Sequence, residues 1–154
     1  MELNEFRIMH STLIEHYQYM EGHLEGIYGA ISDEPFLVGV RTVEKDSLGE
    51  ILREIRTVEK DKGIEVFTRE EHEQLQLVFQ RRNFWCHNCY FDMVFDRKTG
   101  GPAKVRDVHQ LLQDMKEAEA WRERLFERKL QWLEKKWQKN RPAAEEKGSN
   151  GEYV

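Results

Sequence analysis

The chain has 154 residues, a length that suits one folded domain with a single hydrophobic core and without a disulfide framework. Charged residues make up 34% of the chain and hydrophobic residues 39%, a balance typical of small helical proteins with charged outer faces. The net charge of -5 argues against a protein that coats DNA or RNA through a broad basic surface, so any contact with nucleic acid must be local.

The N-terminus and the cysteines indicate the compartment. The first residues, Met-Glu-Leu-Asn-Glu-Phe-Arg, lack the basic segment and the apolar stretch of a signal peptide, and no run reaches the roughly 18 apolar residues of a membrane span. Cys86 and Cys89 are the only cysteines and are too few and too close for a disulfide framework, which fits a reducing compartment. We therefore expect a cytoplasmic protein without a membrane partner.

The first third of the chain predicts a long helix followed by a short segment of uncertain type. Apolar residues recur at steps of three and four from residue 4 to residue 31, which predicts one helix with a single buried face. Asp33-Glu34-Pro35 ends that pattern. Residues 36–40 and, further on, residues 64–67 are short and rich in residues that favour strands. These two segments either pair as a two-stranded ribbon or are extended connectors that pack on the core.

Two capping boxes predict where the next helices begin. Ser47 with Glu50 precedes apolar residues at helical spacing and predicts the second helix. Thr68 with Glu71 predicts the start of the third helix, which should run to about Phe95.

A turn and a long charged helix complete the predicted fold. Residues 96–102, Asp-Arg-Lys-Thr-Gly-Gly-Pro, are the clearest turn in the chain, and apolar residues at helical spacing follow it from Val105 to Leu133. The basic run from Arg128 to Lys139 is interleaved with glutamates and is typical of a solvated helix face. Residues 141–154 are polar and aperiodic, which predicts a flexible tail. We expect an all-α protein, a bundle of about four helices in one domain that spans residues 1–140.

Three tryptophans lie along the last predicted helix, and the sequence leaves two roles open for them. Trp121, Trp132 and Trp137 either close the core or anchor a partner helix or a second subunit.

The stretch with the most chemistry is residues 81–90, Arg-Arg-Asn-Phe-Trp-Cys-His-Asn-Cys-Tyr, within the third predicted helix. Arg82 keeps its charge at any working pH and can fork onto phosphate oxygens, whereas His87 can exchange a proton near neutrality. Such a pair can cleave RNA without a metal. Five positions separate the two residues, about 140° around an ideal helix, so joint action needs a bend, the reach of the arginine or a second copy of the helix.

Residues 82–87, Arg-Asn-Phe-Trp-Cys-His, resemble the Arg-polar-x3-His signature of the HEPN superfamily, whose members are small helical bundles and often ribonucleases. The resemblance implies a homodimer formed through the face of the third helix, in which Arg82 and His87 of two subunits meet. His87 would take the proton of a ribose 2'-hydroxyl and Arg82 would steady the phosphate, which leaves a 2',3'-cyclic phosphate.

The same resemblance implies roles for three neighbouring residues. Asn83 would orient the base or the phosphate, and Arg81 and Tyr90 would contact single-stranded RNA. Tyr90 follows the histidine by three positions, whereas many toxin-type members carry a tyrosine two positions after it. The implied setting is a toxin-antitoxin or phage-defence system, with an antitoxin or other protein partner and no cofactor.

Two alternatives stay open for these residues. The chain is either a nuclease or a non-catalytic helical module that binds a partner protein, a nucleotide or RNA. In the second case Arg82 pairs with a carboxylate at the bundle edge, and His87 is a hydrogen-bonded interface residue. A metal or redox site at Cys86 and Cys89 is disfavoured because zinc takes about four ligands and no second cysteine pair exists. His16 and His23 lie seven positions apart on the first helix, and we expect partly buried, hydrogen-bonded histidines there, with no metal.

Overall fold

The computed structural model describes residues 1–94, 98–99 and 108–140. Within this part of the chain the regular structure is entirely helical, and the expected all-α class is confirmed. The elements are α1 (Leu3–Ile31), α2 (Phe36–Val43), α3 (Leu48–Lys62), α4 (Arg69–His87), the π-helical segment η1 (Tyr90–Val94) and α5 (Val108–Lys139). The predicted tail, residues 141–154, lies outside the described residues, and of the predicted turn at 96–102 only Lys98 and Thr99 are described, in a turn.

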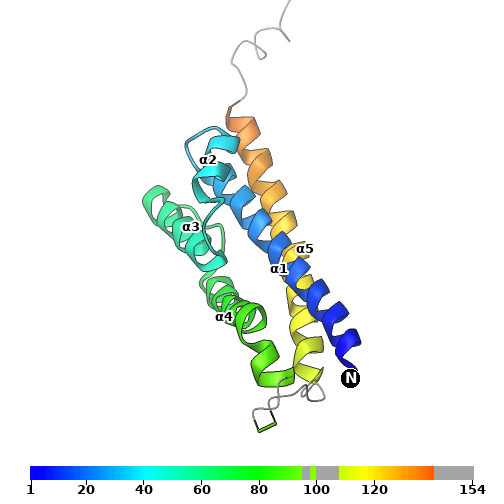
Figure 1. The fold of residues 1–154 in the computed structure, drawn as a ribbon. Coiled ribbons are helices and arrows are strands. Elements are labelled where there is room, and N and C mark those ends of the chain that lie inside the picture. Colours follow the sequence, from blue (N-terminus) through cyan, green and yellow to red (C-terminus); the bar gives the residue numbers. More distant parts are fainter. Residues whose placement is uncertain (95–97, 100–107, 141–154) are drawn as a thin grey trace, which may run out of the picture.

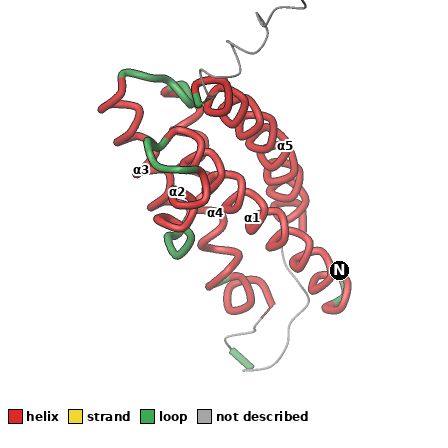
Figure 2. Tube along the Cα trace, turned by 90° about the horizontal axis from the view of Figure 1, so that it is seen from above, coloured by secondary structure: helices red, strands yellow, loops and turns green. Residues whose placement is uncertain are grey.

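The two longest helices, α1 and α5, run side by side in the same direction and form the spine of the molecule (Figure 1). Seen from above, they occupy one side, while α2, α3 and α4 gather on the other (Figure 2). The core lies between these groups, and the buried residues of α1 follow the predicted helical spacing. No described helix combines the length and apolar character that a bilayer crossing requires.

Local signals in the sequence set the ends of α3 and α4. The side chains of Ser47 and Thr68 each accept a hydrogen bond from the backbone N–H three residues later, and Glu50 and Glu71 reach back to the N-cap N–H groups. Both predicted capping boxes are therefore confirmed. Gly63 ends α3 with φ at 64°, in the left-handed region where glycine costs nothing sterically.

For residues 36–40 both alternatives, the ribbon strand and the extended connector, are wrong, because the segment belongs to a helix, α2. Helix α2 packs so closely on the end of α1 that a Cβ built on Gly39 would lie 2.5 Å from Ser32 Oγ and 2.9 Å from Gly29 Cα. This tertiary contact outweighs the weak strand preference of the segment. Residues 64–67 form an irregular connection with Val66 and Phe67 buried, so the connector alternative is confirmed for that segment.

The contact between α1 and α2 leads to a prediction about stability. Gly39→Ala should lower the free energy of unfolding by about 1–3 kcal/mol, because the new methyl group must push the backbone of α1 aside. Gly22→Ala is the matched control, since nothing lies within 4 Å of its added Cβ, and it should stabilise α1 by about 0.5–1 kcal/mol. Urea unfolding of both variants measures the difference. Equal effects would contradict the close packing of α2 on α1.

The third predicted helix differs from the structure at its C-terminal end. The α-helix ends at His87 with Asn88 as its C-cap, and the chain continues as η1, so the prediction of one helix to about Phe95 is wrong; Phe95 itself lies outside the described residues. A π-helical turn holds an extra residue, which shifts the buried face by one position and lets the adjacent Met93 and Val94 both enter the core. Segments of this type are rare and often lie at functional sites.

The three tryptophans of α5 take different positions. Trp121 is buried and closes the core, and Trp132 is partly buried against it. Trp137 is 79% exposed, so it does not close the core.

Candidate functional site

The C-terminal half of α4 carries the predicted motif, and its arginine faces α1. Arg82 Nη2 lies 3.0 Å from Glu21 Oε1, and Arg82 Nη1 donates a hydrogen bond to Asn83 Oδ1 at 3.2 Å. The contact with Glu21 is an ion pair through the buried Oε1 atom. Burial raises the pKa of Glu21 despite the charge of Arg82. About one fifth of the arginine side chain stays exposed.

The predicted proton acceptor, His87, is the last residue of α4 and is exposed. It forms no hydrogen bond or ion pair within the described residues. Asn83 lies one turn earlier on the same side of the helix, whereas Arg82 is about 140° away around the helix axis. One copy of the chain therefore presents Asn83 and His87 together and directs Arg82 toward α1.

The second arginine of the motif, Arg81, faces the opposite long helix. Its Nη1 atom donates to both carboxylate oxygens of Glu117, at 2.8 and 2.9 Å, and its Nε lies 3.8 Å from Asp114 Oδ1. Burial raises the pKa of Glu117 even though Arg81 opposes the shift. The guanidinium thus joins α4 to α5. To contact a substrate, it would have to leave its ion pair with Glu117.

The last predicted site residue, Tyr90, opens η1 and packs edge-on against two rings of α1. Ring centroids lie 5.5 Å apart for Phe6 and 5.3 Å apart for His10. Partial burial raises the pKa of Tyr90. Its ring is still 37% exposed and, like His87, it is accessible at the junction between α4 and η1.

The cysteines beside the motif lack the features of a reactive or metal-binding pair. Cys86 is exposed, while Cys89 is buried, with Sγ 3.2 Å from the carbonyl oxygen of Trp85 and 3.5 Å from His10 Nε2. Burial raises the pKa of Cys89 to about 11 and raises that of Cys86, so both thiols are protonated at neutral pH. Within the described ranges, no three His, Cys, Asp or Glu side chains are grouped so that they could hold a metal ion.

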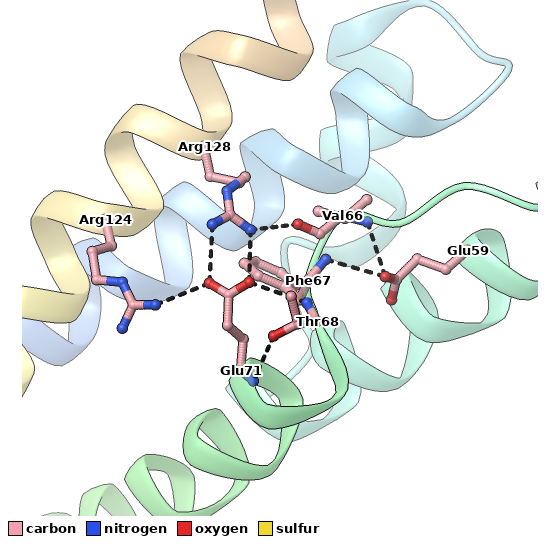
Figure 3. A network of polar contacts seen from close by, with 7 residues as sticks. All are labelled: Glu59, Val66, Phe67, Thr68, Glu71, Arg124 and Arg128. Atoms are coloured by element: carbon pink, nitrogen blue, oxygen red, sulfur yellow. Dashed lines mark hydrogen bonds and ion pairs between the residues drawn. The ribbon is translucent and has the colours of Figure 1, made fainter.

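A second polar cluster, which the sequence did not reveal, ties the connection between α3 and α4 to α5 (Figure 3). Glu71 accepts from Arg124 Nη2 at 3.0 Å and from Arg128 Nη2 at 2.9 Å, and Arg128 also donates to the carbonyl oxygen of Val66. Burial opposes ionisation of Glu71, but hydrogen bonds from Arg128 and the Thr68 backbone outweigh it and lower its pKa. The predicted solvated face of α5 is therefore wrong at Arg128, which is mostly buried.

The same cluster continues into α3 through Glu59. Its Oε2 atom accepts from the backbone N–H groups of Val66 and Phe67, and its Oε1 atom lies 2.6 Å from Nε2 of the buried His72. Both oxygens of this carboxylate and the ring nitrogen are engaged. The cluster thus has the character of a structural clamp, because its polar atoms are used within the protein.

The histidines of α1 are hydrogen-bonded, as expected from the sequence. His10 Nε2 lies 2.7 Å from the carbonyl oxygen of Trp85, His16 Nδ1 lies 3.2 Å from Arg122 Nη1, and His23 Nδ1 lies 3.1 Å from Lys129 Nζ. Each ring therefore contacts a residue of another helix, either α4 or α5.

Comparisons of the chain with protein-family models, with curated proteins and with solved structures gave no match. The likeness to HEPN proteins therefore depends on residues 82–87. Function has to be argued from the chemistry of the motif and its surroundings.

Proposed function

We propose that the chain is a metal-independent endoribonuclease of the HEPN type that cleaves single-stranded RNA. The observation that supports this most is the exposed His87, which has no partner among the described residues and lies one helical turn after Asn83. An accessible imidazole can take the proton of a ribose 2'-hydroxyl near neutral pH. The rare π-helical segment that follows it is a second supporting feature.

The reaction calls for a cation that stabilises the crowded phosphate, and Arg82 is the proposed source. Its ion pair with Glu21 directs it away from His87 of the same copy. We propose that the active enzyme is a homodimer through the α4 face, in which Arg82 and His87 from two subunits meet at one phosphate. Asn83 would orient the RNA, and Tyr90 and a released Arg81 would contact neighbouring nucleotides.

The proposed setting is a cytoplasmic toxin or phage-defence protein with an antitoxin or another protein partner. The net charge of -5 offers little general attraction for RNA, so the target must be recognised specifically or delivered by a partner.

The test is cleavage of single-stranded RNA by purified protein in EDTA. His87→Ala and Arg82→Ala should each reduce the rate about 100-fold or more, because each removes a group that acts in the transition state. His109→Ala is the matched control, since His109 is also an exposed histidine, bonded within α5 to Gln113. This variant should cleave like the wild type. Equal rates in all three variants, or no cleavage by wild-type protein, would reject the nuclease.

The ion pair between Arg82 and Glu21 favours a second candidate function, a non-catalytic helical module that binds a partner, a nucleotide or RNA. In that case Arg82 is mainly a link between α4 and α1. Arg82→Ala and Glu21→Ala would then destabilise the protein to a similar degree, while His87→Ala would change neither stability nor any RNA product. Thermal unfolding beside the RNase assay distinguishes the two functions.

A further inference from the structure

The outer face of α5 carries a row of apolar side chains that the core does not use. Phe126, Leu130 and Trp137 are 44%, 49% and 79% exposed, and Leu133 between them is partly buried. Steps of four, three and four residues place these side chains on one face of the helix, with the spacing of positions d, a, d and a in a heptad repeat. We call residues Phe126, Leu130, Leu133 and Trp137 the α5 row.

The α5 row continues onto the beginning of α2. A hollow between the two helices is lined by Pro35, Phe36, Leu130, Leu133 and Trp137, among others. Leu37 is also exposed at this end of the molecule. An apolar surface of this kind is unusual in a protein that is 34% charged, and contiguous apolar patches commonly mark interaction sites.

On one flank of the α5 row, two cations face α1 and meet no carboxylate of the described residues. Arg122 donates to His16 Nδ1 at 3.2 Å and lies over the ring of Tyr19 at 3.7 Å. Lys129 bonds to His23 Nδ1 at 3.1 Å, and burial, followed by the charge of Lys129, lowers the pKa of that imidazole to about 4. Within the described residues neither cation forms an ion pair, so both could accept a carboxylate from outside.

On the other flank of the row, Glu127 and Glu134 are exposed and form no ion pair within the described residues. In heptad terms, Arg122 and Lys129 occupy g positions, and Glu127 and Glu134 occupy e positions. When two such helices run parallel, each g residue lies beside the e residue five positions later in the partner. Lys129 then faces Glu134 of a second copy.

We infer that the α5 row is a docking site for a second copy of this chain, whose α5 runs parallel to the first. The parallel arrangement buries the apolar row against itself and supplies a carboxylate to Lys129, which forms no ion pair within the described residues. An antiparallel arrangement would bring Lys129 near a second cation and Glu134 near a second carboxylate, which is unfavourable. The charge pattern therefore selects both the occupant and its direction.

The contact should be short. Glu119 and Glu123 occupy the seam positions that precede Phe126, so like charges of the two copies would meet there and the helices must separate. About two heptads of contact give a dimer that depends on protein concentration. This surface is separate from the α4 face, and the inference does not depend on the ribonuclease proposal.

Charge reversal tests the pairing with matched variants. Lys129→Glu and Glu134→Lys should each weaken self-association by about tenfold or more, because each places like charges across the seam. An equimolar mixture of the two variants should associate, since every reversed charge then meets its opposite, and the double variant should regain the dimer. Sedimentation over a range of concentrations measures all four. A wild-type protein that is always monomeric, or a dimer that neither variant weakens, would overturn the inference.

A cross-link tests the direction of the helices. In a Cys86→Ser background, Leu133→Cys should form a disulfide-linked dimer under mild oxidation, because only a parallel seam brings the two 133 positions together. Gln131→Cys, which lies on another side of α5, is the control and should stay monomeric. Equal cross-linking of both variants, or none at position 133 in a protein that sediments as a dimer, would contradict the parallel seam.

Discussion

Replacing Glu71 by alanine is expected to lower the free energy of unfolding by about 3 kcal/mol, one of the two largest effects that the structure predicts. The carboxylate caps α4 through the backbone of Thr68 and holds Arg124 and Arg128 of α5, so one substitution loses a capping box and two charge-assisted contacts. Arg128 would remain mostly buried without its carboxylate. Urea unfolding measures the change.

Glu70→Ala is the matched control for that substitution, because Glu70 is the exposed neighbour in the same first turn of α4. Its free energy of unfolding should fall by about 0.5 kcal/mol, because only the favourable interaction of Glu70 with the helix dipole is lost. If both variants lost the same amount, the clamp between α4 and α5 would contribute nothing measurable.

Acidification should weaken the same clamp. The pKa of Glu71 in the folded protein lies below its ordinary value of 4.5, so the stabilisation is fully present above about that pH and is lost as the pH falls through the folded pKa. Glu71→Gln removes this titration. The difference in stability between wild type and Glu71→Gln should therefore shrink on going from neutral pH to about pH 3, and a constant difference would contradict the lowered pKa.

Local signals were sufficient to predict most of the helices. The capping boxes at Ser47 and Thr68 act over three residues, and the apolar spacing of α1 repeats over many turns, so both can be read from neighbouring positions. Neither the ribbon strand nor the extended connector considered for residues 36–40 is correct, because the helix that forms there, α2, depends on a contact between Gly39 and α1 that no local pattern encodes.

The site was harder to predict because its partners are distant in sequence. Residue types and spacing pointed to Arg82 and His87, and the exposure of His87 is compatible with that hypothesis. The pairing of Arg82 with Glu21 joins two different helices and has no sequence signal. The same holds for Glu71 and Arg128, which are 57 residues apart. Pairing across a bundle depends on helix rotation and direction, which the sequence does not specify by itself.

The second large effect is expected at Trp85, where alanine should lower the free energy of unfolding by about 4 kcal/mol. The side chain is completely buried beneath the motif, and its Nε1 donates to Asp114 Oδ2 at 2.7 Å. Asp114 is itself buried, so the substitution leaves both a cavity and a carboxylate oxygen without its indole donor.

Trp85→Phe helps to separate these two contributions, because it keeps one six-membered ring in the core and removes the donor. The substitution should lower the free energy of unfolding by about 1–3 kcal/mol, the penalty for a buried acceptor that has lost its partner. Trp137→Ala is the matched control, since that tryptophan of α5 is 79% exposed and should change monomer stability by less than about 0.5 kcal/mol. Urea unfolding at low protein concentration measures all three. Trp85 lies two residues before His87 and binds α5, so its indole holds this end of α4 in place. A similar loss of stability in Trp85→Ala and Trp137→Ala would mean that the indole does not anchor α4 to α5.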